Sequence, residues 1–351
     1  MSDAPLTQQH VQKAALPAWP ALKEHLADIA PGLLLATTIA MASMLVNERY
    51  GGPVMLYALL LGIAFSFLSD HSRLAAGIDF TARQVLRVGV ALLGVRITMG
   101  DVASLGLPTV ALVVSGIAIT IGIGSWIGRA FGLKPDHAVL SAGAVAICGA
   151  SAALAISAVL PRNKTSECNT ILTVIGVTAL STIAMVIYPF IAGAMELSDR
   201  EAGIFIGATI HDVAQVVGAG YTISDEAGDT ATIVKLMRVA CLVPVICLVG
   251  LMMRGKDGDK AHASAPLLPI FLIGFIALMF INSAGLVPMA VQSGLSEASR
   301  WALIAAVAAL GIKTSLSDLF KVGPKPVAVL TLQTVMLAIF ALSGLILFMH
   351  L

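Results

Sequence analysis

Long apolar runs separated by short polar stretches fill the chain from about residue 31 to its end. A helix needs about 20 apolar residues to cross the hydrocarbon core of a bilayer. The pattern therefore predicts an all-α polytopic membrane protein with about eleven transmembrane helices. We expect them near residues 31–47, 53–69, 84–97, 107–130, 137–160, 168–193, 202–222, 231–253, 266–286, 298–313 and 325–350.

The start of the chain differs from the rest, because residues 1–29 are polar to amphipathic. We predict an amphipathic cytoplasmic segment over residues 1–29 and a transmembrane domain over residues 30–351. No small-residue cleavage pattern follows the first apolar run, so we interpret that run as a retained helix and not as a signal peptide.

Lysine and arginine residues indicate the orientation, because they are more frequent in cytoplasmic loops. With the N-terminus inside, fourteen of them fall on the inner side and seven on the outer side. This distribution predicts a cytoplasmic N-terminus and a periplasmic C-terminus.

Composition agrees with a chain embedded in a lipid bilayer. Hydrophobic residues make up 58% and charged residues 12% of the 351 residues, whereas an average soluble domain is about 25% charged. The net charge of +1 does not bear on nucleic-acid binding, and no basic run with interleaved aromatic residues suggests a nucleic-acid site, so we expect no nucleic-acid partner. The four cysteines have no metal-ligand spacing, so we expect neither a metal site nor a disulfide framework, and no cofactor.

An internal repeat links two distant parts of the chain. Leu93-Gly94-Val95-Arg96 is echoed by Leu310-Gly311-Ile312-Lys313, and the likeness continues at a constant offset of 217 residues. The copies fall in the third and tenth predicted helices, which run in opposite senses. The chain is thus predicted to contain an inverted repeat, over about residues 53–130 and 270–350, as secondary transporters do.

Each copy ends a helix in a cation, Arg96 or Lys313. Thr98-x-x-Asp101 and Ser315-x-x-Asp318 then have the spacing of a capping box at the start of a new helix. One interpretation of the cations is a favourable charge at a helix C-terminus. The other is that Arg96 and Lys313 supply positive potential near an anion path.

The fifth predicted helix consists almost wholly of small residues over residues 141–155. Small residues let helices pack closely in membranes, and that alone would explain them. The alternative is a helix broken near Cys148-Gly149. Its free amides at Gly149 and Ala150, with the Ser151 hydroxyl, would then face an anion.

The seventh predicted helix places His211, Asp212 and Gln215 in an apolar segment, where polar groups are costly unless compensated. On a continuous helix, His211 would share a face with Gln215, and Thr209 a face with Asp212. The first pair could polarise a substrate oxygen.

Two further roles stay open for these residues. Asp212 could carry a proton, or it could pair with Lys235 or Arg238 on the next helix. The other interpretation of the whole group is a buried polar network that only locks the helices together.

Enzyme signatures are missing from the sequence. Gly250 to Lys256 nearly match a phosphate-binding loop, but Asp257 stands where Ser or Thr must reach magnesium. There is no His-Glu-x-x-His zinc pair and no Gly-x-Ser-x-Gly nucleophile elbow. We therefore expect a protein that is not an enzyme.

The sequence resembles the YeiH (UPF0324) family of bacterial inner-membrane proteins, also named sulfate exporters. Three runs carry the resemblance, residues 146–152, 207–220 and 310–314. It implies the fold of the cation/proton antiporter and anion transporter superfamily, with two inverted repeats and crossed, broken helices. It also implies location in the inner membrane and export of sulfate or a related sulfur oxyanion.

We therefore expect a secondary transporter that exports a small inorganic or sulfonated anion. Cys148, Gly149, Ala150, Ser151, Thr209, His211 and Gln215 would bind the substrate. Asp212, Arg96, Lys313, Lys235 and Arg238 would supply coupling or charge. The alternatives are a proton- or sodium-coupled carrier of organic anions and, from other classes, an intramembrane enzyme or a membrane sensor. A monomer and a homo-oligomer both stay open.

Overall fold

The computed structural model describes residues 18–69, 71–161, 165–253, 269–314 and 323–349. All regular structure within these ranges is helical. Six helices are long and apolar enough to cross a membrane, over residues 26–50, 106–130, 166–194, 225–252, 289–313 and 324–347. This confirms a polytopic helical architecture of the kind predicted, and the number of eleven crossings stays a prediction.

One part of the bundle, which we call the scaffold layer, comes from both ends of the chain. Its helices are α1 (Ala18–Tyr50), α2 (Val54–Ala64), α3 (Ser72–Phe80), α4 (Leu86–Leu93), α14 (Ile270–Ser283) and α15 (Met289–Lys313). The short helical turn η1 (Ser66–Leu68) precedes α3, and a second one, η2 (Thr81–Val85), connects α3 to α4. Within this layer α15 packs against α2 and α4, α1 against α2 and α3, and α14 against α4.

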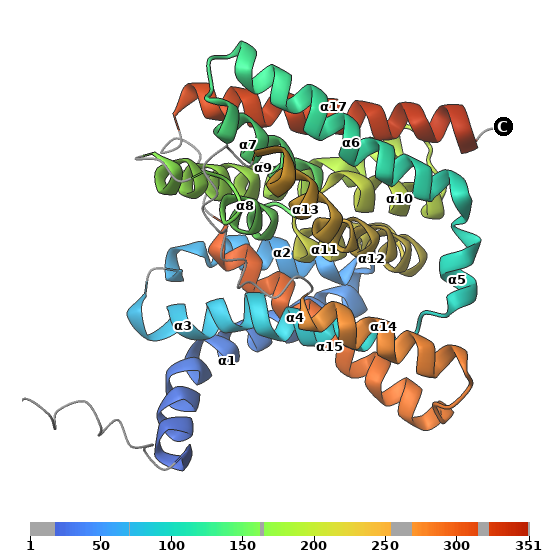
Figure 1. Cartoon of the computed structure of the whole chain (residues 1–351). Helices are drawn as coiled ribbons and strands as arrows, with labels where there is room; N and C mark the ends of the chain where they lie inside the picture. The colour runs from blue at the N-terminus through green and yellow to red at the C-terminus, as the bar shows by residue number, and fades with distance from the viewer. Residues whose placement is uncertain (1–17, 70, 162–164, 254–268, 315–322, 350–351) are drawn as a thin grey trace, which may run out of the picture.

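The other part, the hairpin layer, comes mainly from the middle of the chain. Its helices are α6 (Gly106–Ala130), α7 (Pro135–Ala146), α8 (Ala150–Ser157), α9 (Ser166–Ala194), α10 (Asp199–Thr209), α11 (Val213–Ile223), α12 (Asp225–Ala240), α13 (Leu242–Met253) and α17 (Pro324–Met349). The short helix α5 (Met99–Ser104) connects the layers. They meet where α11 lies against α2 and α15, between the α6–α17 pair and the α1–α3 pair (Figure 1).

The 217-residue offset found in the sequence relates helices of the structure. It carries α2 onto residues 271–281, within α14, and α6 onto residues 323–347, almost the whole of α17. The segment from α3 to α4 is carried onto residues 289–310, within α15. Three consecutive helical segments therefore recur in the same order and with the same spacing.

Packing contacts obey the same offset. A Cβ atom added to Gly94 would lie 2.3 Å from the carbonyl oxygen of Phe275, so α4 and α14 touch backbone to backbone. The repeat-related Gly311 of α15 meets the carbonyl oxygen of Leu59 of α2 at 2.5 Å in the same construction. Since residue 58 is the counterpart of Phe275, the two contacts are equivalent to within one residue.

The two copies also run in opposite directions. Lys313 lies beside Asp79, and Leu303 lies beside Gly89. Numbers rise along one helix as they fall along the other, so α15 is antiparallel to the α3–α4 segment. These copies are therefore inverted relative to each other.

A test of this packing uses Gly77, where α3 crosses α1. A Cβ atom at Gly77 would lie 2.1 Å from the carbonyl oxygen of Ile29 and 2.7 Å from the Cα atom of Gly32. We expect Gly77→Ala to lower the melting temperature in detergent, because backbone atoms cannot move aside cheaply. Gly122→Ala is the control, since nothing lies within 4 Å of its added Cβ. Alanine there should leave stability equal or raise it by up to about 1 kcal/mol. Equal melting temperatures for the two variants would contradict the close crossing.

Candidate functional site

Two helical hairpins occupy the centre of the bundle. In hairpin 1, α7 and α8 fold back on each other, because a Cβ atom on Gly143 would lie 2.4 Å from Cδ1 of Ile156. The predicted break near Cys148-Gly149 is confirmed, since α7 ends at Ala146 and α8 begins at Ala150. The expectation of one straight span over residues 137–160 is wrong.

Hairpin 2 is formed by α10 and α11, which both pack on α12. Along α10, Gly203 lies beside Thr230 and Gly207 beside Val234, so α10 is parallel to α12. Along α11, Gly220 lies beside Gly228, at the start of α12. Both ends of hairpin 2 are therefore at the Asp225 end of the bundle, and residues 202–222 do not form the single span that we expected.

The hairpins enter the bundle from opposite ends, as their contacts with α9 show. His137, at the start of hairpin 1, lies 3.4 Å from Thr173, near the start of α9. The ring of Phe205 in hairpin 2 packs against that of Tyr188, near the end of α9, with 5.1 Å between the ring centroids. The tips meet between these levels, where a Cβ atom on Gly149 would lie 3.3 Å from Cβ of His211.

Local sequence explains both tips. Gly149 has φ of +61° and ψ of −120°, a conformation that only glycine adopts without strain. Ile210 is extended, and the Asp212 carboxylate accepts the amide of Ala214 at 2.9 Å as the N-cap of α11. Because α10 ends at Thr209, the prediction that Thr209, His211, Asp212 and Gln215 share faces of a continuous helix is wrong.

Two buried cations of α12 hold the tips together. The ammonium of Lys235 donates to the carbonyls of Ile147 at 2.7 Å and Ile210 at 2.9 Å, and also to that of His211. The Arg238 guanidinium donates to carbonyls of both hairpins. Its partners are Ala146 (3.2 and 2.9 Å), Gly207 (3.1 Å), Ile210 (3.0 Å) and Val145 (3.0 Å).

These contacts satisfy the carbonyls left free where α7 and α10 end, which carry partial negative charge. Lys235 and Arg238 are 0% and 1% exposed. The predicted pairing of either cation with Asp212 is not found. Among the described residues, ion pairs join only Arg83, Arg96 and Lys313 to carboxylates. Within the described part of the chain, the two buried charges at the tips thus donate only to backbone carbonyls.

His211 and Gln215 lie at the tip of hairpin 2, and each has one buried side-chain atom without a hydrogen-bond partner among the described residues. His211 contacts the Thr334 hydroxyl of α17 through Nε2 at 3.0 Å, and the Gln215 amide donates to Thr182 at 2.7 Å. Nδ1 of His211 and Oε1 of Gln215 are buried without a partner among the described residues. The Ser181 hydroxyl accepts the backbone amides of His211 and Asp212 at 3.2 and 3.1 Å.

The other predicted binding residues lie at or near the tips in different environments. The buried Thr209 hydroxyl donates to the carbonyl of Phe205 at 2.5 Å, within its own helix. Cys148 is buried in the tip of hairpin 1, whereas Ser151, the second residue of α8, is exposed. The structure therefore brings Cys148, Gly149, His211, Asp212 and the two cations together, and turns Thr209 toward its own backbone.

Sequence reasoning missed Ser181, Thr182 and Thr334, which contact His211, Asp212 and Gln215. Their only signal is a hydroxyl in an apolar helix. That signal is weak, because serine and threonine commonly bond the carbonyl one turn earlier in such helices.

Arg96 and Lys313 do not face one shared site. Arg96 pairs with Asp229 at 3.2 Å near the Asp225 end of the bundle, and Tyr221 donates to the same carboxylate. Lys313 pairs with Asp79, toward the opposite end. The predicted capping box at Thr98 and Asp101 is confirmed, and its counterpart at Ser315 and Asp318 lies outside the described residues.

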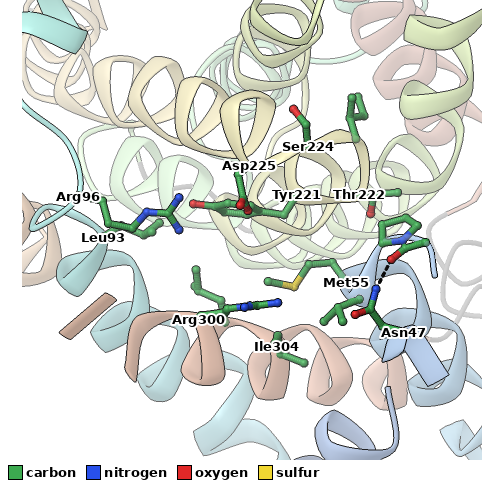
Figure 2. Close-up of a pocket in the computed structure, with 15 residues that line it drawn as sticks. Asn47, Met55, Leu93, Arg96, Tyr221, Thr222, Ser224, Asp225, Arg300 and Ile304 are labelled. Atoms are coloured by element: carbon green, nitrogen blue, oxygen red, sulfur yellow. Dashed lines mark hydrogen bonds between the residues drawn. The ribbon is translucent and has the colours of Figure 1, made fainter. Parts of the chain in front are cut away.

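A cavity of about 360 Å³ opens between the two layers beside Arg96. Figure 2 shows the side chains of Arg96 and Arg300 extending into it from the scaffold layer, opposite Tyr221 and Asp225 of the hairpin layer. It is lined by Asn47, Gly52, Pro53, Val54, Met55, Leu93, Arg96, Tyr221, Thr222, Ile223, Ser224, Asp225, Arg300, Leu303 and Ile304.

Comparison with known proteins agrees with this architecture. The family described as Conserved hypothetical protein 698 matches residues 31–330. UPF0324 membrane protein CT0845 of Chlorobaculum tepidum is 49% identical over 320 residues, which cover 90% of this chain and 89% of the relative. The chain belongs to the UPF0324 family of membrane proteins.

Two further relatives support the assignment. UPF0324 membrane protein TauZ of Paracoccus pantotrophus is 50% identical over 321 residues, covering 90% of this chain and 94% of that protein. UPF0324 membrane protein RB0971 of Rhizobium meliloti is 49% identical over 322 residues, covering 91% and 93%. The resemblance stated from the sequence is confirmed, and this UPF0324 protein lies in a lipid bilayer.

Proposed function

We propose that this UPF0324 protein is a secondary transporter that exports a small anion across a bacterial inner membrane, with its N-terminus in the cytoplasm and its C-terminus in the periplasm. The observation that carries the proposal is the meeting of two oppositely directed hairpins at Lys235 and Arg238. Their charges have no carboxylate partner among the described residues. Secondary transporters place substrate sites where broken helices meet near the middle of an inverted repeat.

Electrostatics favours an anion at the tips. Burying a charge costs several kcal/mol even after relaxation, and an anion nearby would offset part of that cost. The N-termini of α8 and α11 add partial positive charge at the same place. The Asp212 carboxylate already caps α11, whereas α8 has Gly149 as its N-cap and no side-chain hydrogen bond there.

The groups that would contact the anion follow from this arrangement. The first amides of α8, the Ser151 hydroxyl and Nδ1 of His211, in the tautomer that places the proton on Nδ1, are donors close to the tips. Gln215 already donates through its amide nitrogen to Thr182 and Thr178 and so holds the tip in place. Lys235 and Arg238 would act through their charge, since their donors already serve carbonyls. Sulfate, sulfite or a sulfonate is the substrate class that the resemblance favours.

A second candidate is a proton- or sodium-coupled carrier of organic anions, with Asp212 as the coupling carboxylate. The half-buried position of Asp212 at the tip favours this second candidate. We also propose that the protein is not an enzyme. Although His211 contacts the Thr334 hydroxyl, its other nitrogen meets no carboxylate among the described residues, as a nucleophile triad would require.

The test is flux of labelled sulfate, sulfite and taurine into proteoliposomes. We expect His211→Ala and Gln215→Ala to lower the rate by tenfold or more, because each removes a buried polar group at the tips. The controls His71→Ala and Gln84→Ala alter exposed residues of the scaffold layer and should transport normally. Unchanged flux in both tip variants would contradict the site. Flux insensitive to pH and sodium would exclude the coupled carrier.

A further inference from the structure

The cavity beside Arg96 is lined by a second arginine, Arg300, which has no part in the site at the hairpin tips. Arg300 points into the cavity (Figure 2), and among the described residues no hydrogen bond or ion pair is found for it. Arg96 on the same wall is held by Asp229 at 3.2 Å. One guanidinium is therefore fixed by a carboxylate, and the other is free to bind a ligand.

The inverted repeat places an equivalent pair on the other side of the scaffold layer. Residues 83 and 300 are both arginine at the offset of 217, and Arg96 corresponds to Lys313. Because α15 packs antiparallel to the α3–α4 segment, Arg83 and Arg300 lie on opposite sides of the midpoint of these two packed segments. One unit of two cations, Arg96 with Arg300, therefore lies toward one face of the membrane, and the other unit, Arg83 with Lys313, lies toward the opposite face.

The two units differ in whether their carboxylate engages one cation or both. Asp79 accepts from Arg83 at 3.0 Å and also from Lys313, so it bridges both cations of its unit. The residue at the repeat-related position on α15 is Ser296, which has no charge. One carboxylate thus engages both cations of the unit at Arg83 and Lys313, whereas in the other unit Asp229 engages Arg96 and Arg300 faces the open cavity.

We propose that Arg300 with Arg96, and Arg83 with Lys313, form two equivalent access sites for a small oxyanion, one toward each face of the membrane. This inference rests on the proposed transport function and adds where the anion is first bound. In this structure the first site is open, and the bridge through Asp79 closes the second.

The chemistry of the open site suits an oxyanion. Guanidinium groups bind oxyanions through paired hydrogen bonds. On the wall opposite Arg300, the Thr222 hydroxyl already donates to Gly218, whereas the Ser224 hydroxyl accepts from Ala227 and keeps its own proton to donate. The cavity of about 360 Å³ is much larger than the roughly 10–15 Å³ that one water needs, so the anion can arrive with part of its hydration shell. Asp225 on the far wall repels an anion, which places the oxyanion on the Arg300 side.

The experiment uses the full-length protein reconstituted in a single orientation, with labelled sulfite or sulfate supplied from one side at a time. We expect Arg300→Gln to raise KM about tenfold for anion supplied at the cavity side and to change KM from the other side less than twofold. Arg83→Gln should show the reverse. Arg49→Gln, an exposed arginine at the cavity end of α1, should change neither. Equal effects on both sides, or no effect of Arg300→Gln, would overturn the proposal.

A second measurement does not depend on transport. Thr222→Cys, in protein whose Cys168, Cys241 and Cys247 are replaced by serine, puts a thiol on the cavity wall. Sulfate should slow its reaction with a charged thiol reagent, and Arg300→Gln should abolish that protection. Protection without any wild-type flux would reject the transporter proposal and keep the binding site. Absence of protection would overturn the access site even if flux is normal.

Discussion

Replacing Arg238 with glutamine is expected to prevent stable folding. The guanidinium of Arg238 donates five hydrogen bonds to four carbonyls, two in each hairpin. A buried acceptor left without a partner costs about 1–3 kcal/mol, so losing several approaches the total stability of about 5–15 kcal/mol. Purification in detergent should give aggregated protein, or a melting temperature far below wild type.

One further variant separates charge from geometry at Arg238, and another variant is the control. Arg238→Lys keeps the charge but has a shorter reach and fewer donors, so we expect an intermediate melting temperature. Arg129→Gln removes an exposed arginine at the end of α6 and should behave as wild type. If Arg238→Gln were as stable as Arg129→Gln, the two hairpins would not depend on this residue.

The apolar pattern predicted the helical segments of both layers because long hydrophobic runs leave few alternatives to a membrane helix. It could not distinguish a span from a hairpin. Hairpin 1, residues 135–157, contains two helices of 12 and 8 residues, which together have the length and hydropathy of one crossing. Only the glycine at position 149 indicated the break, and nothing in the sequence gave the direction of α8 after it.

The offset of 217 residues also had a limit that the structure explains. Hairpin 1 and α9 follow α6, whereas hairpin 2 and α12 precede α14. Since α11 is antiparallel to α12, and its Gln215 and Gly218 follow Thr182 and Met185 of α9 in the same direction, α9 and α12 run in opposite senses. Hairpin 2 with α12 is thus the inverted counterpart of hairpin 1 with α9, placed before its repeat and not after it. No single offset can align a repeat whose parts are permuted in this way.

The partners of the buried cations were beyond sequence reasoning for a related reason. Asp212 is near Lys235 and Arg238 in sequence and has the opposite charge, so an ion pair was the natural expectation. The carbonyls at the ends of α7 and α10 have no sequence signature, because every residue has a carbonyl. They become acceptors only because both helices end at the same place.

Gly149→Ala is the substitution that we expect to affect the tips most directly. Its backbone has φ of +61° and ψ of −120°, and leaving such a conformation or tolerating it with a side chain costs about 1–3 kcal/mol. The new Cβ atom would also lie 3.3 Å from Cβ of His211 and 3.5 Å from Val177. We therefore expect a lower melting temperature and loss of anion flux, because the tips must move apart.

Gly132→Ala is the matched control, because this glycine also has positive φ, of +81°, but nothing lies within 4 Å of the added Cβ. It carries backbone strain without a contact between hairpins, so it should lower stability and leave flux per folded molecule unchanged. The difference in flux between the two variants then reports on the contacts that a Cβ atom at residue 149 makes with His211 and Val177. Equal flux in both would mean that transport does not depend on the meeting of the two tips, and the substrate site would have to lie elsewhere in the hairpin layer.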